Sequence, residues 1–202
     1  NVKGLLLGDA ISYVRQIYHE FYLAGYYVQH WLLDASKMGV PQRRERVFFI
    51  ALRKDLAKPF LKQMNLFDIL PEIKLEFNEP KINYGDIKTE LGRIASKLYF
   101  ERWTKREPTD TCFGDITKRL NGSGSCFSDV FAKDELPLPT ITSKGGVYDF
   151  ESGHYISDDS FKKAGSYPLD YDFKGNGVPY LVGMSVPPVM TANIATEIYS
   201  QW

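Results

Sequence analysis

The stretch "GYYVQHWLLDASKMGVPQRRERVFFIALR", residues 25–53, decides the fold of the first part of this chain. Residues 26–33 are aromatic and β-branched, which predicts a strand. Residues 47–52 are apolar throughout, which predicts a second strand buried on both faces. A loop over residues 34–46 joins the two strands, so we expect it to hang from the edge of a sheet.

Three arginines, Arg43, Arg44 and Arg46, end this loop directly before the apolar strand. A planar guanidinium suits phosphate oxygens or the hydrogen-bonding edge of a base, and a rigid strand would hold it in register. The simpler interpretation is a basic turn exposed to solvent, as runs of charge usually are. The pattern alone leaves both interpretations open.

The flanking residues predict helices. Apolar side chains recur at three- and four-residue spacing over residues 9–24, which is typical of one helical stripe, and Gly25 follows as a helix stop. Near the end of the chain, Pro187 and Pro188 suit the first turn of a helix, where their missing amide hydrogens cost little. Apolar residues continue along that helix: Val189, Ile194, Ile198 and Trp202.

The middle of the chain has a different character. Residues 66–138 show short runs, mixed charge, scattered prolines and the tract "NGSGS" at 121–125, without strong periodicity. These features predict a separate, irregular and β-rich module. We therefore expect three parts, over residues 1–65, 66–138 and 139–202.

The composition excludes several classes of protein. With 44% hydrophobic residues the chain is not disordered, and its 25 basic and 25 acidic residues give no net charge that favours nucleic acid or membrane. Cys112 and Cys126 have neither the number nor the spacing of a disulfide framework or zinc site, which suits a reducing cytosol. No stretch approaches the roughly 18 to 20 apolar residues of a membrane span. We expect a cytoplasmic protein without a metal site.

Several motifs carry a resemblance to a known family. Residues 25–53 resemble the DNA (cytosine-5) methyltransferases, in which Gly-Tyr, a strand, a small-residue loop, Gly-Val-Pro-Gln, alternating arginines and an apolar strand occur in this order. The opening "NVKG" looks like the tail of the family's Glu-Asn-Val motif, cut just after the glutamate. "YLVGMSVPPVMTANIATEIY" is similar to the closing Gly-Asn-Ser-Val-Pro-Pro motif and its helix, and "ISDDSFKKAGSYPLDYDF" looks like a diverged form of the segment before it.

The resemblance implies a fold and an activity. The fold would be α/β, namely the C-terminal part of a Rossmann-like, S-adenosylmethionine-dependent methyltransferase sheet plus a smaller target-recognition domain over residues 66–138. The family adds a cysteine thiolate to a flipped-out cytosine and transfers a methyl group from S-adenosylmethionine to carbon 5. The implied partners are double-stranded DNA and, in a restriction–modification system, a cognate restriction endonuclease.

The resemblance also assigns roles to the arginine loop. Arg46 would reach the carbonyl oxygen of the cytosine, while Arg44 would lie near the nucleophile and the target phosphate. Gln42 would shape the loop, and Arg43 would meet the DNA backbone. Asn1 would be what remains of the Glu-Asn-Val motif, whose glutamate is absent.

Neither cysteine fits the nucleophile of the family. That residue lies in a Pro-Cys-Gln context upstream of Glu-Asn-Val, whereas Cys112 stands in "DTCFGD" and Cys126 in "GSCFSD". We interpret both as buried or incidental. The glycine-rich cofactor turn is missing as well, and the chain begins with Asn1 rather than Met, so we expect a fragment that is inactive alone.

The closing motif implies a cofactor contact. Gly183, Ser185 and Val186 match the family pattern, and Met184 stands where asparagine is usual, although it could still line the pocket.

Basic residues interleaved with aromatic ones are the candidates for DNA contact, and Thr142 would follow the DNA backbone with Lys144. The alternative for the basic residues is a solvated surface of mixed charge. The candidates are Arg43, Arg93, Arg102, Lys105, Arg106, Arg119, Thr142 and Lys144.

Two other functions stay open. A tRNA-directed member of the same family would keep the chemistry and change the substrate. A DNA-binding remnant without catalysis would keep the interface alone.

Overall fold

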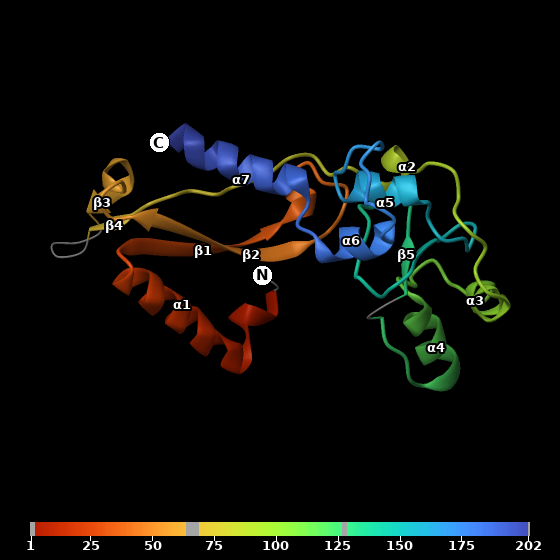
Figure 1. Ribbon diagram of the computed structural model, residues 1–202. Helices are drawn as coiled ribbons and strands as arrows, with labels where there is room; N and C mark the ends of the chain where they lie inside the picture. The colour runs from red at the N-terminus through yellow and green to blue at the C-terminus, as the bar shows by residue number, and fades with distance from the viewer. Residues whose placement is uncertain (1–2, 64–68, 127–128, 202) are drawn as a thin grey trace. The chain divides into compact units, whose positions relative to one another are not determined.

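The computed structural model describes residues 3–63, 69–126 and 129–201 (Figure 1). The chain forms two compact units. Unit 1 comprises Asn1–Asp34, Glu45–Asn78 and Thr191–Trp202, and unit 2 comprises Ala35–Arg44 and Glu79–Met190. The expected functional domains, with boundaries after residues 65 and 138, stay a prediction.

Unit 1 is built on an antiparallel pair of strands. Two short 3-10 helices, η1 (Lys3–Leu6) and η2 (Gly8–Ala10), lead into α1 (Ile11–Leu23), which is followed by β1 (Tyr26–Asp34) and β2 (Glu45–Arg53). The register of β1 and β2 runs from Tyr26 opposite Arg53 to Asp34 opposite Glu45, and α1 packs against β1 (Figure 1). The predicted helix and both predicted strands are confirmed.

The predicted burial of the second strand on both faces is wrong. Only Val47 and Leu52 of β2 are buried, and the other apolar residues of the strand are partly exposed. Within the described residues β2 belongs to a two-stranded sheet, so no third strand pairs with it there. An apolar run therefore overstated how deeply the strand lies.

Two further pieces complete unit 1. The 3-10 helix η4 (Lys58–Phe60) precedes the antiparallel strands β3 (Leu61–Gln63) and β4 (Ile69–Pro71). Helix α7 (Pro188–Gln201) begins at a proline as predicted, and its residues from Thr191 onward belong to unit 1. Gln201 accepts a hydrogen bond from the Lys74 N–H at 3.0 Å and donates to the Lys74 carbonyl at 2.8 Å. Trp202, expected on the apolar stripe of this helix, lies outside the described residues.

Unit 2 consists of short helices, irregular chain and one small parallel strand pair. Its elements in chain order are η3 (Ala35–Lys37), α2 (Tyr84–Ile87), α3 (Lys97–Trp103), α4 (Phe113–Asn121), β5 (Val130–Ala132), β6 (Val147–Asp149), α5 (Asp158–Ala164) and α6 (Val178–Met184). The prediction of a β-rich module is therefore wrong. In α4, Phe113 and Ile116 are buried one turn apart, and Gly122 ends the helix at φ +80°. The sequence has a short helical period there, which the prediction of irregular chain overlooks.

Two apolar clusters form the core of unit 2. The first gathers residues from α2, β5, β6, α5 and α6 around Leu138 and Ile141. The second surrounds Phe113 and Tyr148, and Tyr99 stacks on Tyr148 with ring centroids 5.5 Å apart. Because Leu138 and Ile141 are fully buried in the first cluster, the segment that carries them is fixed in place.

Candidate functional site

Residues 35–44 of the arginine loop pack within unit 2, and this part of the loop is not a solvated turn. The Ala35 N–H donates to the Arg44 carbonyl at 3.0 Å, and Gly39 takes a φ of +70°, which favours glycine. Leu138 lies alongside the loop, because the Arg43 N–H donates to its carbonyl at 2.8 Å and its own N–H donates to the Pro41 carbonyl at 3.1 Å. The loop therefore has a defined conformation that is set by contacts within the unit.

Arg44 is buried, with 1% of its surface exposed. Its Nη1 atom donates to the Gln42 side-chain oxygen at 3.2 Å and to the Ile141 carbonyl at 2.8 Å. Its Nη2 atom donates to the carbonyls of Gly183 and Ser185 at 2.7 and 2.8 Å. Both terminal nitrogens are therefore bound to groups of the protein itself. The expectation that Arg44 lies near the nucleophile and the target phosphate stays a prediction.

Gln42 is fully buried beside Arg44. Its Nε2 atom donates to the Ala164 carbonyl at 3.2 Å, and its Oε1 atom accepts from the Ile141 N–H at 3.3 Å. The expectation that Gln42 shapes the loop agrees with these contacts. We call the two buried side chains, Gln42 and Arg44, the polar clasp.

Arg43 and Arg46 are placed differently from the polar clasp. Arg43 is exposed, which leaves its guanidinium accessible, and Arg46 is half-buried opposite Leu33 at the start of β2. Burial lowers the pKa of Arg46 from its ordinary value, but a guanidinium stays charged in proteins. Its Nη1 atom donates to the Glu45 carbonyl at 2.7 Å. Asn1, the other predicted catalytic residue, lies outside the described residues.

The predicted cofactor residues stand at the end of α6. The Ser185 hydroxyl donates to the Val182 carbonyl at 3.0 Å, and the carbonyls of Gly183 and Ser185 accept from Arg44. Met184 is 62% exposed and Val186 is 37% exposed. This segment can offer a ligand apolar contact from Met184 and Val186.

Arg93 and Lys144 line one hollow of about 860 Å³ in unit 2. The Arg93 guanidinium stacks 4.3 Å above the ring of Tyr155, and Lys144 is exposed. Thr142 accepts a hydrogen bond from the Gly145 N–H at 3.0 Å, which closes the turn that presents Lys144. Three carboxylates share the hollow with the two cations: Glu90, Asp129 and Asp158.

The other predicted DNA-binding residues lie around α3 and α4. Arg119 pairs with Asp110 at 2.6 Å and with Glu107 at 3.2 Å. The Arg106 guanidinium stacks 4.0 Å above the Trp103 ring. Lys105 is exposed and Arg102 partly so. For Arg119, the alternative of a mixed-charge surface fits these contacts better than a phosphate site.

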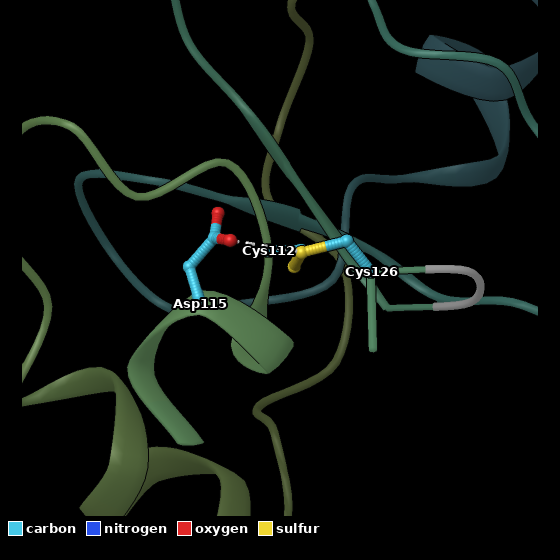
Figure 2. A group of neighbouring side chains, drawn as sticks. All are labelled: Cys112, Asp115 and Cys126. Carbon is cyan, nitrogen blue, oxygen red and sulfur yellow. Dashed lines mark hydrogen bonds between the residues drawn. A yellow bond between two sulfur atoms is a disulfide. The ribbon is translucent and has the colours of Figure 1, made fainter. Parts of the chain in front are cut away.

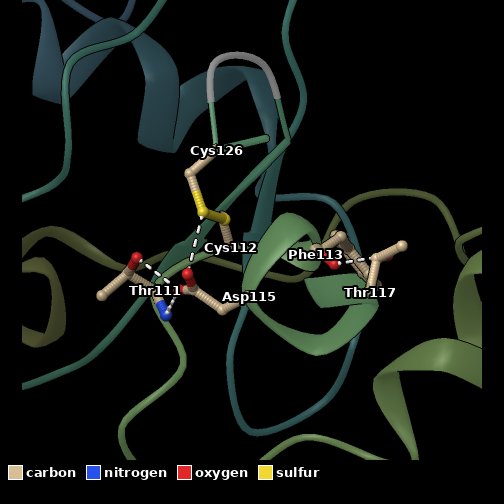
Figure 3. Close-up of a disulfide and its surroundings, with 6 residues drawn as sticks. All are labelled: Thr111, Cys112, Phe113, Asp115, Thr117 and Cys126. Atoms are coloured by element: carbon tan, nitrogen blue, oxygen red, sulfur yellow. Dashed lines mark hydrogen bonds between the residues drawn. A yellow bond between two sulfur atoms is a disulfide. The ribbon is translucent and has the colours of Figure 1, made fainter. Parts of the chain in front are cut away.

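Cys112 and Cys126 form a disulfide, which corrects the expectation that the two cysteines are unpaired and either buried or incidental; Cys112 is buried (Figure 3). Cys112 precedes α4, and the segment after the helix returns Cys126 to it, with the Cα atoms 5.4 Å apart. A carboxylate oxygen of Asp115 lies 3.2 Å from the Cys126 sulfur (Figure 2). Sequence spacing missed the pair because it does not reveal that a helix and its return bring the two ends together.

The same three side chains could be taken for a metal site. Their potential ligand atoms lie within 4.8 Å of one another. However, both sulfurs are used in the disulfide, so neither is a thiolate that could bind a cation or attack a ring. The Asp115 carboxylate accepts instead from the backbone and side chain of Thr111, both at 2.7 Å (Figure 3).

An ion pair between Lys88 and Asp149 was also not predicted from the sequence. The two side chains meet at 2.6 Å, and Asp149 is 1% exposed. Burial alone would raise the pKa of Asp149, but hydrogen bonds from Lys88 and Ser152 hold the pKa below its ordinary value. No local pattern relates the two residues, which are far apart along the chain.

The sequence matches a known protein family. The profile of the family described as C-5 cytosine-specific DNA methylase matches residues 1–200. Within the described residues, no helix is both long and apolar enough to cross a membrane.

Individual relatives agree with the family match. The chain is 28% identical over 214 residues to the Type II methyltransferase M.NgoFVII of Neisseria gonorrhoeae, covering 98% of this chain and 56% of the relative. It is 46% identical over 117 residues to the Type II methyltransferase M.BsuRI of Bacillus subtilis, covering 56% of this chain and 27% of the relative. The chain thus spans about half or less of the length of these relatives.

Solved structures share the fold. The methyltransferase EhMeth of Entamoeba histolytica aligns with a TM-score of 0.60 and 12% identity, over 99% of this chain and 61% of that chain. A DNMT2 of Spodoptera frugiperda aligns with a TM-score of 0.61 and 15% identity, over 98% and 65%.

Proposed function

Because the chain belongs to the C-5 cytosine-specific DNA methylase family, we propose that the protein transfers a methyl group from S-adenosylmethionine to carbon 5 of a cytosine in a specific sequence of double-stranded DNA. The family match over residues 1–200 carries the proposal. Since the chain spans about half the length of its relatives, the activity is proposed for the whole protein.

Arg46 is the residue of this chain proposed to act on the base. Its guanidinium would donate to the carbonyl oxygen of the flipped cytosine, which draws electron density from the ring and favours attack by a nucleophile. Its position at the start of β2 supports this role, because a strand end holds a side chain more precisely than a free loop. Neither Cys112 nor Cys126 is the proposed nucleophile, because both sulfurs are in the disulfide.

The segment Gly183–Val186 is proposed to contact the cofactor. The exposed side chains of Met184 and Val186 fit an apolar part of such a ligand. The carbonyls of Gly183 and Ser185 accept from Arg44, so the proposed contact is made by side chains and not by these oxygens. When bound, S-adenosylmethionine supplies the electrophilic methyl group.

DNA contacts are proposed for Arg43, Arg93, Lys144 and the turn at Thr142. Arg43 is exposed in the arginine loop, and Arg93 and Lys144 share one hollow. A recognition role for residues 66–138 predicts that their replacement by the matching segment of a relative changes the methylated sequence. The Type II relatives support a further proposal, that the enzyme protects DNA from a cognate restriction endonuclease.

The test is methyl transfer by the whole protein. Duplex DNA and tRNA would each be incubated with S-adenosylmethionine, and 5-methylcytosine would be measured by mass spectrometry of the nucleosides. We expect the product in DNA. Methylation of tRNA alone would identify the tRNA-directed alternative, and DNA binding without methylation would identify a non-catalytic protein; either result rejects the proposal.

The role of Arg46 has a matched control on the same strand. Arg46→Ala should reduce methylation by about a hundredfold or more, in keeping with the loss of one donor to a developing charge. Arg53→Ala changes the exposed arginine at the other end of β2, which pairs with Asp55, and should leave methylation unchanged. Equal activity of the two variants would refute the role of Arg46.

A further inference from the structure

The polar clasp joins three segments that are far apart in the sequence: the arginine loop, the segment at Ile141 and the end of α6. We propose that Arg44 is a positioning residue that holds the DNA-contacting turn after Ile141 and the cofactor-contacting segment Gly183–Val186 in one arrangement. This role rests on the proposed function of those two segments. It differs from a direct contact of Arg44 with DNA.

The end of α6 explains why an arginine is needed. The last carbonyls of a helix lack partners within the helix and carry partial negative charge, which a cation stabilises. The Gly183 and Ser185 carbonyls are such groups, and Nη2 of Arg44 donates to both. Nη1 meanwhile reaches Ile141, so one planar guanidinium binds both segments at once.

The backbones of the two segments also touch directly. A Cβ atom built on Gly183 would lie 2.6 Å from the Ser143 nitrogen and 2.7 Å from the Thr142 oxygen. Only a glycine permits so close an approach without a shift of backbone. The turn that presents Lys144 is therefore seated on the end of α6, with Arg44 buried at the same junction.

Loosening this junction should weaken the binding of DNA and of the cofactor. Each loss of affinity should be measurable in the absence of the other ligand. A lysine at position 44 keeps the charge but offers one nitrogen in place of a fork, so it cannot bind Ile141 and both α6 carbonyls in the same way. Cofactor affinity should fall without DNA, because the segment that contacts the cofactor loses its support. A residue that bound only a DNA phosphate would leave the cofactor affinity of the DNA-free protein unchanged.

The experiment compares Arg44→Lys with Arg43→Gln in the whole protein. S-adenosylmethionine binding would be measured by calorimetry without DNA, and DNA binding would be measured over a series of salt concentrations. Arg44→Lys should weaken cofactor binding about tenfold or more, as expected from the loss of charge-assisted hydrogen bonds. It should also weaken DNA binding at every salt concentration, because the DNA-contacting turn loses its support, and leave the salt slope unchanged because Arg44 itself contacts no phosphate. Arg43→Gln should lower the salt slope by about 1 and leave cofactor binding unchanged.

The inference is overturned if Arg44→Lys lowers the salt slope and keeps the cofactor affinity of the wild type. Hydrogen exchange provides a readout that does not depend on activity. Amides of residues 138–146 and 181–187 should exchange faster in Arg44→Lys and not in Arg43→Gln; equal exchange in both variants also overturns it. If the wild type methylates nothing, the proposed function fails, while the exchange result still decides whether Arg44 holds the junction.

If Arg44→Lys does not fold, Gln42→Met is tested in its place. This change removes the Gln42 oxygen that accepts from Nη1 of Arg44 but keeps the guanidinium and its carbonyl partners. The same peptides should exchange faster, and cofactor binding should weaken less than in Arg44→Lys. Unchanged exchange in Gln42→Met would count against the polar clasp.

Discussion

The strand pair of unit 1 and the irregular chain of unit 2 are held by different kinds of contact. In unit 1, β1 and β2 pair over their whole length, and the ion pairs Lys3–Glu45 and Arg53–Asp55 involve side chains that are about half exposed. In unit 2, Arg44 and Asp149 are each 1% exposed and bound to groups of the protein. Replacing one of these charged side chains with an apolar one should therefore cost far more stability in unit 2 than in unit 1.

The largest effect is expected for Lys88→Met. The change leaves Asp149 buried without its cation, which should lower the free energy of unfolding by about 3 kcal/mol, at the low end for a buried pair because Lys88 is partly exposed. The measurement is urea unfolding of the whole protein, with hydrogen exchange to assign the loss to unit 2. Lys3→Met removes the exposed Lys3–Glu45 pair of unit 1 and should change stability by no more than about 1 kcal/mol.

Equal losses in Lys88→Met and Lys3→Met would break the contrast between the two units. A double variant, Lys88→Met with Asp149→Leu, sharpens it. Replacing both charges with apolar side chains should restore part of the lost stability, because the cost lies in the unpaired carboxylate.

The disulfide should give a comparable effect that is also confined to unit 2. Both cysteines of the chain belong to that unit and are 14 residues apart, so reduction should lower its stability by about 3 kcal/mol. Hydrogen exchange with and without dithiothreitol would show faster exchange in α4, while β1 and β2 keep their protection. Cys112→Ala combined with Cys126→Ala should not respond to the reductant, and a response would trace the effect to something other than the disulfide.

The stability of unit 1 is expected to be sensitive to the truncation of buried apolar side chains. Val47 is 1% exposed in β2, and Val47→Ala removes two buried methyl groups, which should cost about 2 kcal/mol. Leu32, its partner across the strand pair, is 37% exposed, so Leu32→Ala should cost less than Val47→Ala despite the larger truncation. Urea unfolding of the two variants gives the comparison, and the reverse order would contradict the assigned burial.

The regular elements of unit 1 could be predicted because their signals are local. An aromatic and β-branched run marked β1, an apolar run marked β2 and a helical period marked α1, while Pro188 marked the start of α7. Burial could not be read in the same way. The depth of β2 depends on what covers the sheet, so an apolar run predicted more burial than Val47 and Leu52 alone provide.

The candidate site shows the same limit in unit 2. The pattern of arginines singled out the loop of the candidate site, but the burial of Arg44 depends on Ile141, Gly183 and Ser185, which are distant in the sequence. A local pattern cannot tell which of two adjacent arginines meets such partners. The disulfide was missed for the same reason, since pairing depends on the return of the chain after α4.

The smallest expected effect is a difference in acid sensitivity between the units. Asp149 has a folded-state pKa below its ordinary value, since hydrogen bonds from Lys88 and Ser152 outweigh its burial. Its carboxylate therefore stabilises the fold above the unfolded pKa of about 3.9, and this contribution is lost as the pH falls through the lower folded pKa. Asp55 in unit 1 also has a lowered pKa, through Arg53, but its side chain is exposed and solvent screens its contribution.

Stability of the two units, followed by hydrogen exchange coupled to urea unfolding between about pH 6 and about pH 3, should fall further in unit 2 than in unit 1. Asp149→Asn removes the titrating group while keeping its shape, so this variant should be less stable at neutral pH and should lose less on acidification. A wild-type acid response that persists unchanged in Asp149→Asn would assign it to other carboxylates. The contrast between the units would then rest on the ion pair and the disulfide alone.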